Sequence, residues 1–180
     1  MLLDVGIVPA LIRHLGSERG ALEAAWSLSN ITAGTPEQIQ MVIDAGALRP
    51  LIDLLGPEHD VAIRREACWA VSNVTAAGTR EQALHIAAMH IVQPLGELLG
   101  CGDKLATKLA FEALQNVFKA DEQGGVGVVA QAKDCGLEEH LKALADTSED
   151  VACTFGCAML LEQLKGDDGV LTMLVKPATE

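Results

Sequence analysis

The sequence predicts an all-α protein, a right-handed superhelical solenoid of about four repeats with three helices each. Two observations predict this fold. Hydrophobic residues make up 49% of the 180 residues but aromatic residues only 3%, and there is no Tyr, a composition that favours helices over strands. A Leu-rich segment with a proline near its start also recurs along the chain, as in stacked arrays of helices.

The recurring segment defines the repeats. It begins at residues 6, 46, 90 and 136, where the chain reads GIVPALIRHL, GALRPLIDLL, HIVQPLGELL and, in degraded form, GLEEHLKAL. We therefore expect a repeat array over residues 1–166 and a polar tail over 167–180. The units of the array are expected at about 1–34, 35–78, 79–123 and 124–166. Met1–Val5 is typical of the end of a helix, so we expect the chain to open inside a unit of a longer array.

A proline stands near the start of each short Leu-rich helix. Pro9, Pro50 and Pro94 occupy the first turn, where the missing N–H costs little. A longer helix is expected to follow, over 20–33 in the first unit and 61–77 in the second. A strand would need alternating polar and apolar residues, which these segments lack.

Glycine and threonine mark the end of the long helix and the start of the next one. Gly34 and Gly78 stand where a left-handed C-terminal cap prefers glycine. Segments 35–38 and 79–82 both have the form of a capping box, with Thr as N-cap and Gln three residues on. A further helix is therefore expected to begin at each of these threonines.

The charge of the chain limits its partners. The formal net charge is −12 and the sequence pI is about 4.7, so the positive footprint needed for nucleic acid or anionic lipid is missing and a cationic partner would suit the chain. No apolar run approaches the roughly 20 residues of a membrane-spanning helix. The first residues also lack the features of a secretion signal. We expect a soluble, unsecreted protein that binds neither nucleic acid nor membranes.

Neither catalysis nor metal binding is expected. The chain has no Gly-rich phosphate loop, no Gly-x-Ser-x-Gly elbow and no His-Glu-x-x-His motif, and its five histidines fall at unrelated places in the repeats. Five cysteines in apolar contexts are typical of core residues in a reducing compartment. Cys153 and Cys157 share a helix face, but no His or second Cys pair supports them as ligands. We therefore expect no metal, no cofactor and no enzymatic activity.

Two helices carry the same Trp-x-x-x-Asn pattern, at Trp26/Asn30 and at Trp69/Asn73. The segments around them read WSLSNITAGTPEQ (26–38), VIDAGALRPLI (42–52), EACWAVSN (66–73) and ALQNVFKADE (113–122). These segments resemble the armadillo repeats of importin-α, the adaptor family that carries nuclear localisation signals. The resemblance covers about residues 5–164.

The resemblance implies that the chain corresponds to the C-terminal part of the adaptor, from about the seventh armadillo repeat to the tenth. In the family this region holds the smaller of two sites for basic nuclear localisation signals. Its last repeats contact the export receptor and a nucleoporin. The protein would then work in the cytoplasm and the nucleus. No segment resembles the basic N-terminal stretch that recruits importin-β in the family.

A helical wheel separates a polar-aromatic face from the core stripe. At about 100° per residue, Trp26, Asn30 and Glu23 share one face of the first long helix. The apolar residues Ala21, Ala24, Leu28 and Ile31 lie opposite. The counterpart set on the second long helix is Trp69, Asn73 and Glu66, opposite Ala67, Val71 and Val74. Both Trp/Asn pairs are therefore expected to face away from the core.

This set suits an extended basic peptide. Asn can hydrogen-bond the N–H and C=O of a peptide backbone whatever its side chains are. The indoles of Trp26 and Trp69 can form a slot for a Lys or Arg stem, with a cation–π contribution of about 0.5–2 kcal/mol. Glu23 and Glu66 can receive the charged head, and by resemblance Glu66 is the closer match to an acidic residue that pairs with a ligand lysine. A helix spacing of about 8–10 Å corresponds to about two to three peptide residues per repeat.

The Trp/Asn pair is incomplete in the third unit and absent from the fourth. Asn116 is kept, but the Trp position before it is Glu112, and Phe111 is one residue out of register. In the fourth unit Met159 takes the Asn position, and neither member of the pair remains. We therefore expect a site limited to the first two units, which suits a short basic cluster.

Other interpretations stay open. Trp in a helical repeat can be a packing residue, Asn near a helix end can serve as a cap, and acidic residues can simply be solvated. The chain could also be an armadillo scaffold or signalling protein that binds acidic or apolar partner helices, although an acidic groove argues against acidic ligands. A third possibility is a docking end for the export receptor, for which Trp26 and Trp69 would be dispensable.

Overall fold

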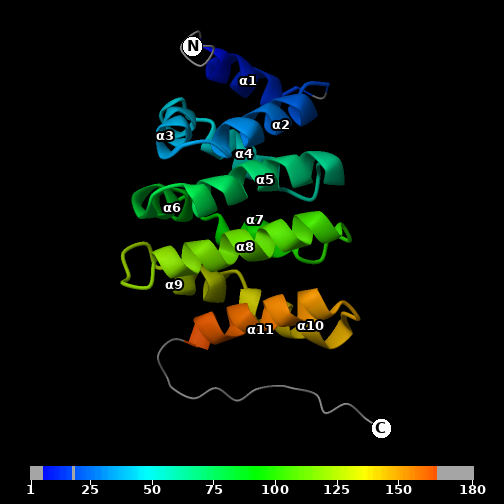
Figure 1. Cartoon of the computed structure of the whole chain (residues 1–180). Helices are drawn as coiled ribbons and strands as arrows, with labels where there is room; N and C mark the ends of the chain where they lie inside the picture. The colour runs from blue at the N-terminus through cyan, green and yellow to red at the C-terminus, as the bar shows by residue number, and fades with distance from the viewer. Residues whose placement is uncertain (1–5, 18, 166–180) are drawn as a thin grey trace.

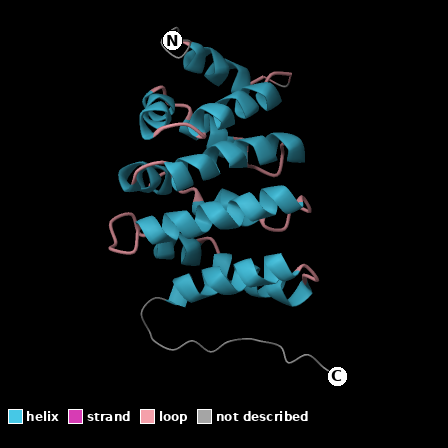
Figure 2. Ribbon diagram, viewed as in Figure 1, coloured by secondary structure: helices cyan, strands magenta, loops and turns pink. Residues whose placement is uncertain are grey.

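The computed structural model describes residues 6–17 and 19–165, and no strand occurs among them (Figure 2). Their helices are α1 (Ile7–Leu15), α2 (Ala21–Thr32), α3 (Pro36–Asp44), α4 (Leu48–Asp53), α5 (Val61–Ala77), α6 (Arg80–Ala87), α7 (Val92–Leu98), α8 (Lys104–Ala120), α9 (Val128–Asp134), α10 (Leu137–Thr147) and α11 (Val151–Lys165). The predicted all-α fold is confirmed. The expected helix end at Met1–Val5 and the polar tail 167–180 lie outside the described residues.

The helices stack in layers along one axis (Figure 1). The triplets α3–α5, α6–α8 and α9–α11 follow one another, and α1 with α2 precedes them. The long helices α2, α5, α8 and α11 pack on one another in that order, and each also contacts the short helix before it, which is α1, α4, α7 or α10. The predicted solenoid is confirmed, whereas the unit limits near residues 34, 78, 123 and 166 stay a prediction.

Both predicted capping boxes are present. Thr35 Oγ1 accepts a hydrogen bond from the Gln38 N–H (3.4 Å), and Gln38 Oε1 accepts one from the Thr35 N–H (2.9 Å). Thr79 and Gln82 exchange the same two bonds, at 3.3 and 3.0 Å. These bonds satisfy N–H groups that have no partner within the helix, so they fix where α3 and α6 begin.

The predicted left-handed caps at Gly34 and Gly78 are wrong. Gly78 is extended, with φ −74° and ψ 169°, and Gly34 is not among the described residues with positive φ. A Cβ at Gly34 would collide with the Gln38 side chain, and one at Gly78 with the Val74 carbonyl oxygen. Glycine is therefore favoured here by a lack of space beside the capping box, and not by a left-handed backbone.

The core lies between the layers and contains the two stripes that the helical wheel predicted. Its buried members on α2 and α5 include Ala21, Ala24, Leu28, Ala67, Val71 and Val74, while Ile31 is half-buried. Arg64 is also buried, and it donates to Leu55 O at 2.9 Å and to Glu97 O, in the next layer, at 3.5 Å. These two carbonyls accept hydrogen bonds from the guanidinium, so Arg64 links two layers.

The cysteines behave as packing residues. Cys68 and Cys157 are buried, and burial raises the pKa of the Cys157 thiol to about 12, which keeps it protonated. Within residues 6–17 and 19–165, no three His, Cys, Asp or Glu side chains gather closely enough to hold a metal ion. Over the same ranges, no helix has the length and apolar character needed to cross a membrane.

Candidate peptide-binding face

The residues of the predicted site lie on one face of the stacked long helices. We call it the ladder face and define it by two columns of equivalent positions, each with one residue from α2, α5, α8 and α11. The first column is Trp26, Trp69, Glu112 and Phe155, and the second is Asn30, Asn73, Asn116 and Met159. Each helix thus supplies one rung, and the rungs follow the order in which the long helices pack (Figure 1).

Both Trp side chains are exposed on adjacent rungs. Trp26 is 58% exposed and Trp69 40%, whereas Leu28 and Val71 on the opposite stripes are fully covered. A packing residue would bury its ring, since burial is how a large aromatic side chain stabilises a core. The exposure therefore argues against the packing interpretation of the Trp residues, and it leaves two indoles available to a ligand.

Asn73 has a structural role in addition to its place on the face. Its Nδ2 donates to Ser29 O near the end of α2 at 2.9 Å, so it links two rungs. Asn30 donates instead to Trp26 O in its own helix, also at 2.9 Å. A side-chain amide has two N–H groups and an oxygen, so both residues keep hydrogen-bonding capacity for a ligand. The capping interpretation thus applies in part to Asn73.

The two acidic residues differ in their surroundings. Glu23 is exposed on α2, whereas the Glu66 side chain is only 14% exposed. Arg65 Nε lies 3.8 Å from Glu66 Oε1, and its Nη1 lies 2.9 Å from Asp103 Oδ2. Because Asp103 is the nearer partner of Arg65, Glu66 retains attraction for a second cation, although less than an isolated carboxylate would have.

The third rung lacks an aromatic stacking surface. Lys108 Nζ lies 3.6 Å from Glu112 Oε1, so an ion pair occupies the position of the indole. Asn116 is kept, and its Nδ2 donates to Thr75 Oγ1 of α5 at 3.4 Å. Phe111 is only 7% exposed and is part of the core between the layers. Its one-residue offset therefore turns it away from the ladder face.

Phe155 on the fourth rung was missed by the sequence analysis. It occupies the Trp column of α11 and is 66% exposed, and Met159 beside it is 42% exposed. The expectation that both Trp and Asn are lost is correct, but an exposed aromatic ring remains. The signal was present in the sequence, because Phe155 precedes Met159 by the same four residues that separate Trp26 from Asn30.

Comparisons with known proteins agree with this architecture. Residues 35–76, which contain α3, α4 and most of α5, match the family described as Armadillo/beta-catenin-like repeat. Importin subunit alpha-4 of Arabidopsis thaliana is 36% identical over 128 residues, 71% of this chain and 22% of that protein. Importin subunit alpha-9 of the same species is 30% identical over 154 residues, 83% of this chain and 29% of that protein. The chain thus spans less than a third of the length of these relatives.

A solved structure extends the likeness to nearly the whole chain. A designed armadillo repeat protein in complex with the peptide (KR)4 superimposes with a TM-score of 0.74 at 28% identity, covering 91% of this chain and 66% of that one. Its layers of helices and those described above therefore share one architecture. Residues 35–76 therefore form an armadillo repeat within an armadillo-type solenoid, and the curated proteins similar to the chain include importin-α subunits.

Proposed function

We propose that this chain binds basic peptides in an extended conformation along the ladder face, and that it acts as part of a nuclear import adaptor. The observation that carries the proposal is the exposure of Trp26 and Trp69 on adjacent rungs. The similarity to importin-α subunits and to an armadillo repeat protein in complex with (KR)4 supports a basic ligand. The ligand would be the localisation signal of a cargo protein moving between cytoplasm and nucleus. Importin-β, the export receptor and a nucleoporin are proposed as partners of a longer adaptor.

Each residue type has a separate task in this proposal. The aliphatic stem of a Lys or Arg lies between Trp26 and Trp69, and its charged head approaches Glu66 or Glu23. Asn30 and Asn73 bond the peptide backbone. In Asn73, the bond to Ser29 O leaves Oδ1 and one N–H for this purpose and holds the amide in position.

Charge selects the class of peptide. With a net charge of −12, the chain attracts cationic segments over a distance and repels acidic ones. The attraction between solvent-exposed charges is screened by salt. Binding by this mechanism is therefore expected to weaken as the salt concentration rises.

Calorimetric titration with a lysine-rich peptide tests the proposal, and a glutamate-rich peptide of equal length serves as the control. We expect micromolar affinity for the lysine-rich peptide, weaker binding at high salt, and no binding of the control. Undetectable or salt-insensitive binding would favour a scaffold for other partners. Binding that survives loss of both Trp side chains would favour a docking end instead.

Single substitutions separate recognition from packing. Trp69→Ala and Asn73→Ala are each expected to weaken binding of the lysine-rich peptide while the helical circular dichroism signal is retained. Trp69 is exposed, so its loss leaves no cavity in the core. If either variant lost its helical signal, the residue would have to be reassigned to packing.

A further inference from the structure

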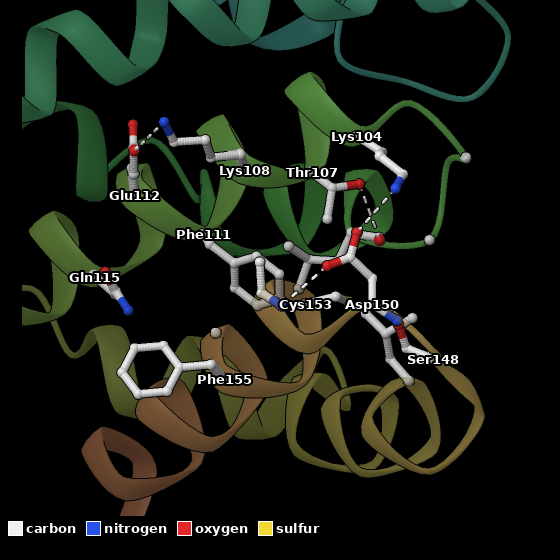
Figure 3. A pocket seen from close by; sticks show the side chains of 16 residues that line it. Lys104, Thr107, Lys108, Phe111, Glu112, Gln115, Ser148, Asp150, Cys153 and Phe155 are labelled. Atoms are coloured by element: carbon white, nitrogen blue, oxygen red, sulfur yellow. Dashed lines mark hydrogen bonds and ion pairs between the residues drawn. The ribbon is translucent and has the colours of Figure 1, made fainter.

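A pocket of about 420 Å³ opens between α8 and α11, next to the last rung of the ladder face (Figure 3). The rings of Phe111, from α8, and Phe155, from α11, both line it. Leu99, Leu144 and Cys153 add further apolar surface. Phe111 is nearly covered, whereas Phe155 is 66% exposed, so one ring belongs to the core and the other remains accessible to a ligand.

Gly156 shapes the pocket. A Cβ at this position would lie 2.9 Å from ring carbons of Phe111, closer than real Cβ contacts. The α11 backbone therefore rests directly against the Phe111 ring, which any larger residue would prevent. This close approach places Phe155, the neighbour of Gly156, at the edge of the same cavity (Figure 3).

The charged groups around the pocket are already paired. Lys104 Nζ lies 3.3 Å from Asp150 Oδ2, and Lys108 Nζ lies 3.6 Å from Glu112 Oε1. Dashed lines mark both ion pairs in Figure 3. Each carboxylate therefore has a cation of the protein beside it, and a basic ligand side chain would have to compete for it. The pocket thus favours an apolar side chain, in contrast to the acidic surroundings of Trp26 and Trp69.

We propose that this pocket receives an apolar side chain, preferably an aromatic one, from the same extended peptide whose basic residues lie on the first two rungs. This inference rests on the proposed function and adds a second anchor to it. Phe155 occupies the Trp position of α11. A peptide that extends from Trp69 along the first column of the ladder face would therefore reach the pocket. The ligand class is therefore a basic cluster joined to a distant hydrophobic residue.

The helix spacing sets the distance between the two anchors. The slot between Trp26 and Trp69 and the pocket between α8 and α11 are two helix steps apart along the stack. At about 8–10 Å per step and 3.3–3.6 Å per extended residue, about five or six residues separate the basic residue from the aromatic one.

The test compares two peptides that share a lysine-rich cluster and a neutral spacer. One has Phe five or six residues from the cluster and the other has Ala there, and each is made with the anchor on either side of the cluster. With the full chain, we expect Phe to tighten binding about tenfold in one of the two orders, a gain consistent with burying an aromatic ring. Phe155→Ala should remove this gain and leave the Ala peptide unaffected.

Val151→Ala is the matched control, because Val151 is 82% exposed on the same helix and does not line the pocket. It should leave the gain from Phe intact. Equal affinity of the Phe and Ala peptides in both orders would overturn the second anchor while the proposed function stands. Failure of both peptides to bind would overturn both. If sedimentation shows a dimer that Phe155→Ala dissociates, the occupant is a second copy of the chain and the inference is wrong.

Discussion

The rungs on α2 and α5 and the rungs on α8 and α11 occupy equivalent positions of one repeat, yet they offer a ligand different chemistry. The first two present exposed indoles, asparagines and the carboxylates Glu23 and Glu66. The last two present a paired Glu112, a single exposed phenyl ring and an apolar pocket. The buried stripes keep the stack uniform, so a few exposed positions per helix are enough to change the surface chemistry from rung to rung.

The largest expected effect is at the indoles. Replacing both Trp26 and Trp69 by Ala should weaken binding of a lysine-rich peptide by about 2–3 kcal/mol, or about thirtyfold to 150-fold, because each ring supplies cation–π and apolar contact. Phe155→Ala should leave the affinity for the same peptide unchanged. Calorimetry measures both. A similar loss in the Phe155 variant would mean that the two regions do not differ.

The next largest effect is expected on stability, at Asp103, which links α5 of the first region to α8 of the second. Asp103 accepts a hydrogen bond from the Ala106 N–H at the start of α8 (2.9 Å) and pairs with Arg65 of α5. Asp103→Ala should lower the free energy of unfolding by about 1–2 kcal/mol, as loss of an N-cap does. Denaturant titration at neutral pH measures this change. An unchanged denaturation midpoint would show that the contacts of Asp103 do not contribute to stability.

This loss should depend on pH. The Ala106 backbone hydrogen bond, with Arg65 adding to it, holds the pKa of the Asp103 carboxyl below its usual range. The stabilisation is therefore present above the unfolded pKa of about 3.9 and disappears as the pH falls through the lower folded pKa. The stability difference between wild type and variant should shrink only in strongly acidic buffer. A difference that grows on acidification would contradict this assignment.

Rebuilding the third rung should produce a moderate gain. Glu112→Trp combined with Lys108→Gln supplies an indole and removes the cation that would otherwise lose its partner. A basic peptide long enough to reach α8 should bind about 1 kcal/mol, or fivefold, more tightly. A shorter peptide confined to α2 and α5 should bind as before. Stability should hardly change, because both groups of the ion pair are largely exposed. Equal gains for both peptides would show that the rungs do not act separately.

The smallest expected effect distinguishes the two asparagines. Asn73→Ala removes a bond between helices and should cost about 1 kcal/mol of stability. Asn30→Ala removes only a bond within α2 at an exposed position and should cost less than about 0.5 kcal/mol. Unfolding midpoints in urea check the difference. Equal losses of stability in the two variants would show that the Asn73 bond between helices contributes no more than the Asn30 bond within α2.

The sequence predicted what depends on local spacing. The capping boxes at Thr35 and Thr79 involve residues three apart, so the starts of α3 and α6 can be identified from the sequence alone. The core stripes of α2 and α5 follow from helical periodicity in the same way. The repeated interval between Trp and Asn also placed both pairs on one exposed face.

What the sequence could not predict depends on neighbouring layers or on close packing. The Asn73 bond needs the position of the Ser29 carbonyl in another helix. The pocket depends on contact between Gly156 and Phe111, which lie in different repeats. Glycine at the end of a helix usually indicates a left-handed cap, but Gly34 has no positive φ, and a Cβ there would collide with the Gln38 side chain.

Intrinsic fluorescence can show whether a basic peptide occupies the first two rungs. Trp26 and Trp69 are the only two Trp residues and the chain has no Tyr, so Trp emission reports on the first two rungs alone. During titration with a lysine-rich peptide without aromatic residues, emission should change and saturate in the micromolar range, with half-saturation at higher concentration in high salt. If calorimetry detects binding of this peptide while Trp emission stays constant, the peptide binds elsewhere and the first two rungs are not its binding site.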